Sequence, residues 1–225
     1  MGRAAKHPIT VSVRHGVRAG LKGVLEAEKA RGEVLSSAPR WQTYGLLRGE
    51  AARVRAGWRT EVQRLRGEGL LLDTVDVLVG FGVGEELRAR GWDRRWPEAP
   101  EEAWDQGRWP GSRDGGFPEK VPARLGGALV ARVVAACWET SREAIEALRA
   151  WRDEHPGITP PRVRVDEDGR EQLVGPLAEY ERLSALVTTT GEIWRAGLQR
   201  GIDRARVLAL ETADVAAGQA GDTTR

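Results

Sequence analysis

The spacing of apolar residues along the chain predicts a mainly helical protein with a few short strands. Ile9, Val11 and Val13 alternate with polar residues, and this period of two is typical of a strand. Apolar residues at steps of three and four predict a long helix over 40–66, which a break at 67–69 ends. Periodic or apolar segments predict the other helices at 17–34, 70–90, 127–139, 141–154, 176–187 and 191–217.

Residues 91–118 interrupt this periodicity and predict a connector rich in Trp, Pro and Gly. The tripeptide Arg-Trp-Pro occurs twice in it, at 95–97 and 108–110. Because Arg beside Trp can stack on bases or on another protein, Trp96 and Trp109 are candidate docking residues for a protein partner. Trp residues of this kind also anchor irregular loops onto the helices beneath them.

Beyond the connector, the chain suggests an internal repeat. Residues 120–125 look extended, and 163–174 resemble a short β-hairpin around an Asp-Glu-Asp-Gly turn. A shift of the chain by 48 residues aligns Leu125 with Leu173 and Gly127 with Gly175, so that each copy reads strand, helix, helix. An ordinary helical bundle with one hairpin would show a similar pattern. The predicted regions are basic helices at 1–90, the connector at 91–118, the repeat region at 119–218 and a disordered tail at 219–225.

The second copy resembles ribbon-helix-helix DNA-binding proteins. The run Glu192–Ile202, with apolar residues at Ile193, Leu198 and Ile202, resembles their second helix, and 177–186 resembles their first. In the earlier copy, the segments that resemble the strand and the two helices are 120–125, 129–138 and 141–151. The resemblance implies two strands that pair into a ribbon and enter the major groove of DNA. Two repeats of one chain, or a homodimer, would complete such a ribbon.

The resemblance also implies which side chains meet the DNA. With Val121, Ala123 and Leu125 turned inward, Lys120 and Arg124 point outward, and both residue types suit guanine. In the second copy, Arg170 and Gln172 take the corresponding places. Pro122 is expected to remove one hydrogen bond of the ribbon. The first amides of the helices after Gly127 and Gly175 are expected to hold phosphates.

The distribution of charge supports a nucleic-acid partner. The 225 residues carry a formal net charge of only +2, yet residues 1–66 hold 14 Lys or Arg against 5 Asp or Glu. Such a basic region is the electrostatic footprint of proteins that bind phosphates. The candidates for phosphate contacts on the predicted helix 40–66 are Arg48, Arg53, Arg55 and Arg59. A solvated arginine-rich helix face would have the same composition.

Motifs for catalysis, metals and cofactors are weak in this sequence. The glycines of Gly80–Gly84 lack the spacing of a dinucleotide-binding turn, and helix packing explains them better. His7, His15 and His155 are too dispersed to predict a metal site. Cys137, the only cysteine, is expected to be a buried small hydrophobe, and its isolation fits a reducing cytoplasm. We expect no signal peptide, and the apolar stretch 70–83 is too short to span a membrane.

These patterns lead to three interpretations. The first is a non-catalytic protein that binds double-stranded DNA without a cofactor, as a transcriptional or mobile-element maintenance factor. The second is a helical adaptor, or a phage packaging or assembly component, that docks a protein through Trp96 and Trp109. The third is an enzyme that binds a nucleotide at Gly80–Gly84. Its test is whether an excess of NAD or ATP raises the thermal stability of the protein.

Overall fold

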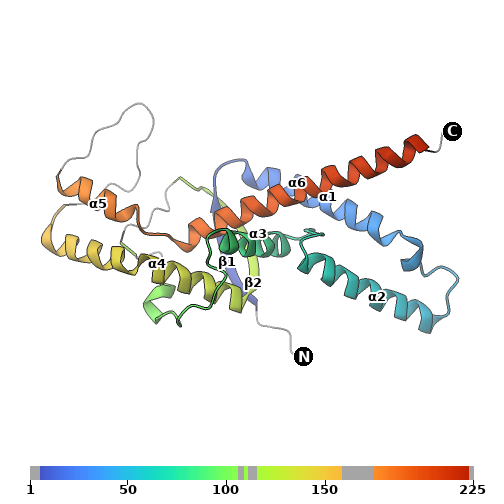
Figure 1. The fold of residues 1–225 in the computed structure, drawn as a ribbon, viewed down its shortest axis with the longest axis horizontal. Coiled ribbons are helices and arrows are strands. Elements are labelled where there is room, and N and C mark those ends of the chain that lie inside the picture. The colour runs from blue at the N-terminus through green and yellow to red at the C-terminus, as the bar shows by residue number, and fades with distance from the viewer. Residues whose placement is uncertain (1–5, 106–108, 111–115, 159–174, 223–225) are drawn as a thin grey trace. The chain divides into compact units, whose positions relative to one another are not determined.

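The computed structural model describes residues 6–105, 109–110, 116–158 and 175–222 of the chain (Figure 1). Within these residues, six α-helices and one two-stranded sheet make up the regular structure, together with two short 3-10 helices. The prediction of a mainly helical protein is therefore confirmed. The hairpin predicted at 163–174 lies outside the described residues.

The elements fall into two compact units, each of which combines two segments that are separated in the sequence. Unit 1 comprises Met1–His15 and Glu86–Arg195, and unit 2 comprises Gly16–Glu85 and Ala196–Arg225. The regions predicted from sequence were consecutive instead, because a strand pairing between distant segments leaves no local signal. In chain order, the elements are β1 (Lys6–Val13), α1 (Val17–Ser36), η1 (Pro39–Trp41), α2 (Arg48–Gly67), α3 (Val75–Ala89), η2 (Glu101–Trp104), β2 (Glu119–Gly126), α4 (Gly127–Glu154), α5 (Pro176–Ser184) and α6 (Thr190–Asp222).

Unit 1 is organised around α4, a single helix where the sequence predicted two. The break expected at Thr140 does not occur, since the Thr140 hydroxyl donates to the Ala136 carbonyl at 2.7 Å inside the helix. Ser141 is fully buried, and its hydroxyl accepts a hydrogen bond from the Thr188 amide at 2.9 Å. Tertiary packing thus overrides the local preference of these hydroxyl residues for turns. The strand-helix-turn-helix pattern expected for the first copy is wrong in this respect.

Several helices also begin or end at residues other than the predicted ones. The helix expected over 40–66 begins only at Arg48, and the one expected over 70–90 begins at Val75. Predicted helix 191–217 extends to Asp222, into the segment expected to be a disordered tail. The start of α6 is capped by Thr189, whose hydroxyl accepts a hydrogen bond from the Glu192 amide at 3.3 Å.

In unit 2, α3 and α6 approach so closely that their backbones touch. A Cβ added at Gly82 would lie 1.9 Å from the Gly197 carbonyl oxygen, and one at Gly201 would lie 2.4 Å from the Leu78 carbonyl oxygen. Only glycine fits at such positions. The expectation that helix packing explains the glycines of 80–84 is therefore confirmed for Gly82.

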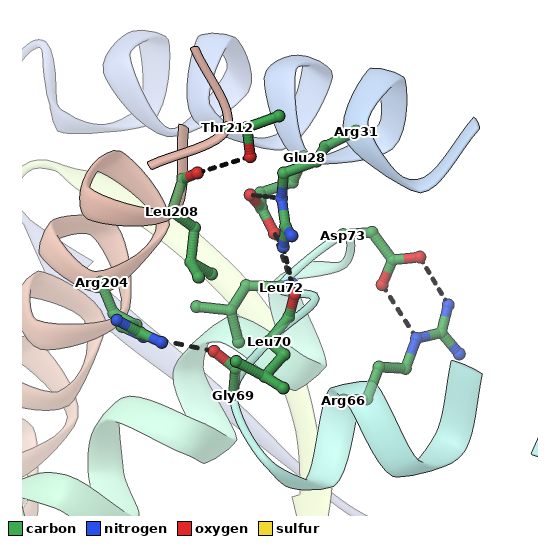
Figure 2. A network of polar contacts seen from close by, with 10 residues as sticks. All are labelled: Glu28, Arg31, Arg66, Gly69, Leu70, Leu72, Asp73, Arg204, Leu208 and Thr212. Carbon is green, nitrogen blue, oxygen red and sulfur yellow. Dashed lines mark hydrogen bonds and ion pairs between the residues drawn. The ribbon is translucent and has the colours of Figure 1, made fainter. Parts of the chain in front are cut away.

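The segment between α2 and α3 is fixed by a buried carboxylate (Figure 2). The Glu28 side chain, on α1, accepts two hydrogen bonds of 2.9 Å from Arg31 and one of 2.6 Å from the Leu72 amide. Arg31 also donates to the Leu70 carbonyl. Glu28 is only 1% exposed, so its charge is stabilised by these donors in place of water.

Two further contacts hold the same segment (Figure 2). Arg66, in the last turn of α2, binds both carboxylate oxygens of Asp73 at 2.9 and 2.7 Å. Arg204, on α6, donates to the Gly69 carbonyl at 3.4 Å. Gly69 itself has a φ of 67°, a conformation that favours glycine and that turns the chain after α2. The break predicted at 67–69 is thus confirmed.

We expect Gly82→Ala to destabilise unit 2, because the new methyl group meets rigid backbone on α6. Overpacking of this kind costs about 1–3 kcal/mol of unfolding free energy. Chemical denaturation is the measurement. The control is Gly23→Ala on α1, where a Cβ meets nothing within 4 Å and the added helix propensity is expected to stabilise. Equal effects of the two substitutions would contradict the close packing.

Glu28→Gln is expected to lower the unfolding free energy by about 3 kcal/mol, since it leaves the Arg31 guanidinium without its charge partner in a buried setting. The matched control is Glu26→Gln. Glu26 lies on the same helix, and its ion pair with Lys22 at 3.8 Å is largely exposed, so its loss should cost less than about 0.5 kcal/mol. Thermal unfolding followed by circular dichroism compares the two variants, and similar midpoints would show that the buried network contributes little.

Candidate nucleic-acid interface

The candidate interface is a two-stranded ribbon with one apolar and one polar face. β1 and β2 pair antiparallel, and the apolar residues of both strands turn inward: Val11, Val13, Val121, Ala123 and Leu125 are all at most 4% exposed. They pack with α4, whose inward face is lined by residues such as Val130, Val133 and Val134. Because side chains alternate along a strand, the opposite face carries Thr10, Ser12, Lys120, Pro122 and Arg124.

Lys120 and Arg124 are both exposed on this outer face, so their predicted orientation is confirmed. Lys120 lies opposite Ser12, and its Nζ donates to the Ser12 hydroxyl at 2.6 Å. Lys120 and Arg124 are four positions apart along β2, so the strand rise places them about 13 Å from each other. That distance corresponds to about four base-pair steps of DNA.

The partner strand of 120–125 differs from the predicted one. The sequence suggested either the strand of the second copy, with Arg170 and Gln172, or the same strand of a second chain. Arg170 and Gln172 lie outside the described residues. The observed partner is β1, with Val11 opposite Val121 and Thr10 opposite Pro122. The signal for this strand was present in the alternation of Ile9, Val11 and Val13, but nothing in the sequence tells a strand which distant segment it pairs with.

Pro122 lies within an unbroken register of the ribbon, opposite Thr10. A proline is compatible with a ladder where its missing N–H would point to the open edge. Pro8, on β1, is in the same situation opposite Arg124. Because neither proline has a backbone N–H, neither can donate a hydrogen bond to a further strand.

The first turn of α4 adjoins the end of β2. Its N-cap is Gly126, which offers no side-chain hydrogen bond, and no acidic residue occupies the first turn. The first amides of the helix therefore keep their capacity to donate to an anion. In α5, the other helix for which phosphate contacts were expected, Glu179 lies in the first turn.

The four candidate arginines of α2 lie in unit 2, and Arg48, Arg55 and Arg59 form a second basic surface that Arg53 does not share. Arg48, Arg53, Arg55 and Arg59 are exposed, and none forms an ion pair or a hydrogen bond with another residue that the structure describes. At 3.6 residues per turn, Arg48, Arg55 and Arg59 lie within about 40° of one another around the helix. Arg64, by contrast, is held by Glu61 and Glu68.

The two candidate docking tryptophans lie in different environments of unit 1. Trp109 is 5% exposed, its ring contacts Trp138 at 5.6 Å between centroids, and its Nε1 donates to the Glu102 carbonyl at 3.2 Å. Its indole is therefore part of the interior and is unavailable to a partner. Trp96 is half-buried, and the Arg94 guanidinium lies 4.1 Å from its ring centroid.

Within the part of the chain that the structure describes, the candidate residues for catalysis lie on separate elements. Gly80–Gly84 lies within α3, so the nucleotide-binding turn considered for it is wrong. His7 lies on β1 and His155 ends α4, where its Nδ1 lies 2.8 Å from the Trp151 carbonyl. Among the described residues, no three His, Cys, Asp or Glu side chains lie close enough to hold a metal ion. No described helix has the length and apolarity needed to cross a membrane.

Comparisons of the chain with protein families, with curated proteins and with solved structures found no match. Any statement about function therefore depends on the residues and geometry of this chain.

Cys137 is fully buried in α4, as the sequence predicted. Burial raises the pKa of its thiol well above the usual range, and the nearby charge of Glu192 raises it further. Because only the thiolate is nucleophilic, we expect no labelling by a thiol reagent between pH 7 and 9 in the native protein and one equivalent after unfolding. Rapid native labelling would contradict this packing of α4.

Proposed function

We propose that the protein is a non-catalytic DNA-binding protein that reads double-stranded DNA with the outer face of the β1–β2 ribbon. The observation that carries the proposal is the separation of the two faces. An apolar face buried against α4 holds the ribbon, and a polar face of hydroxyl and basic side chains is open to solvent. A two-stranded antiparallel ribbon fits the major groove of B-DNA.

The outer side chains suit the hydrogen-bonding groups of base edges. Lysine and arginine donate to the O6 and N7 atoms of guanine, and serine and threonine can donate or accept. Lys120, Arg124 and Thr10 are exposed for such contacts. The free amides at the start of α4 favour a phosphate at the end of the ribbon.

The ribbon needs no second copy of the chain, because both strands come from one polypeptide. This differs from the homodimer that usually forms the ribbon in ribbon-helix-helix proteins. A single chain that reads DNA without catalysis suits a transcriptional or mobile-element maintenance factor.

The arginines of α2 supply nonspecific affinity in this proposal. Exposed guanidinium groups without an acidic partner among the described residues bind phosphates and release condensed counterions. Their contribution is independent of sequence, whereas the ribbon contributes preference among sequences.

The test is fluorescence anisotropy with duplexes selected from a randomised library, titrated against salt. We expect the wild type to bind with an affinity that falls steeply with salt concentration. Lys120→Ala with Arg124→Ala should abolish the preference for selected over unselected duplexes. Arg48→Gln with Arg55→Gln and Arg59→Gln should weaken binding to all duplexes and reduce the log–log salt slope by about 2–3.

The control is Arg142→Ala with Arg152→Ala, which removes the same charge from exposed positions of α4. It should keep the sequence preference. Loss of preference in this control, or no binding by the wild type at low salt, would contradict readout by the ribbon. Absence of DNA binding would favour the adaptor interpretation, with Trp96 rather than Trp109 at the surface.

A further inference from the structure

Unit 1 contains a hollow that the DNA proposal does not use. It has a volume of about 540 Å³, within the range of about 300–1,000 Å³ typical of small-molecule sites. One wall is the connector segment 93–99, another is Trp104 of η2, and the floor is α4. The hollow exists because Ala131 and Ala135, one helical turn apart, present only methyl groups to it.

Two indoles shape the site. Trp96 is fixed by a 3.0 Å hydrogen bond from its Nε1 to the Trp92 carbonyl and by an edge contact with the Trp92 ring at 6.2 Å. Trp104 keeps 46% of its surface exposed, although its ring also contacts His7 at 5.9 Å. An exposed indole beside an apolar floor favours a planar ring, since aromatic pairs gain from stacking in addition to burial.

The charges around the hollow favour a ligand with one negative charge. Its lining includes Arg94, Arg95 and Arg132 against two acids, Asp93 and Glu98. Arg132 is paired with Asp93 at 2.6 Å, whereas Arg95 forms no ion pair or hydrogen bond within the described part of the chain. A guanidinium binds a carboxylate through two parallel hydrogen bonds, which makes Arg95 suited to such a group.

We propose that this hollow binds a small planar aromatic carboxylate. The ring lies between the floor at Ala131 and the indole of Trp104, and the carboxylate pairs with Arg95. The site is built from unit 1 alone and does not require that the ribbon bind DNA.

The experiment is isothermal titration calorimetry of the full chain with naphthalene-2-carboxylate and, separately, with its neutral carboxamide. We expect saturable one-to-one binding of the carboxylate and at least tenfold weaker binding of the carboxamide. Arg95→Gln should weaken binding of the carboxylate about tenfold and leave that of the carboxamide unchanged, because an ionic hydrogen bond is lost.

Ala131→Leu tests the location of the site. Ala131 is exposed on α4, so a leucine there fills the hollow without entering the core, and it should abolish binding of the carboxylate. Ala150→Leu, at an exposed position of the same helix outside the hollow, should bind as the wild type does. Circular dichroism confirms that both variants are folded. No binding of the carboxylate at millimolar concentration, equal binding of the carboxamide, or unchanged binding by Ala131→Leu would overturn the proposal.

Discussion

The burial of one ribbon face against α4 is the constraint on which the candidate interface depends. Each fully buried valine or leucine contributes about 1.5–3 kcal/mol relative to exposure. A slip of β2 by one residue would turn Val121 and Leu125 to solvent and Lys120 and Arg124 to the core. Burial of the apolar face therefore fixes the register of the ribbon, and the register determines which side chains point to solvent.

The sequence predicted the local part of this arrangement but not the pairing. Alternation of apolar and polar residues identified β1, and 120–125 was expected to be extended. The resemblance to ribbon-helix-helix proteins implied the outward direction of Lys120 and Arg124. The partner of 120–125 was expected in the second repeat or in a second chain and not in β1, because pairing between segments more than 100 residues apart depends on the packing of both strands on α4. The same reason explains the missed continuity of α4, since Ser141 resembles a turn residue only as long as its buried environment is unknown.

For the glycines of α3, the prediction of helix packing was correct, but the sequence did not indicate which segment they contact. Gly82 was attributed to helix packing, yet only the contact with Gly197 explains why no larger residue fits. The buried Glu28 gave no such signal, because a glutamate within a charged helix is typically exposed. Its role depends on amide and carbonyl groups of the segment after α2, which no periodicity predicts.

Some charged residues of α2 form ion pairs that stabilise the helix, whereas other arginines of α2 form none with the residues that the structure describes. Arg64 binds Glu61 and Glu68 and lowers the pKa of Glu61 chiefly through its hydrogen bond, and Arg66 binds Asp73. At the other end, Glu50 accepts a hydrogen bond from the Leu47 amide at 3.2 Å and caps the helix. These contacts stabilise α2 from its two ends, although it buries only Ala51 and Leu65. The arginines between them take no part in that stabilisation.

The ribbon differs from one built by two identical chains in a way that bears on the proposal. In a homodimer, both strands present the same side chains, and the DNA site is correspondingly palindromic. Here β1 presents Thr10 and Ser12, whereas β2 presents Lys120 and Arg124. Since hydroxyl groups and cations prefer different base edges, a site read by this ribbon has no reason to be symmetric. In the proposed mode of binding, the pairing of two unlike strands would thus give a single polypeptide a direction along the major groove.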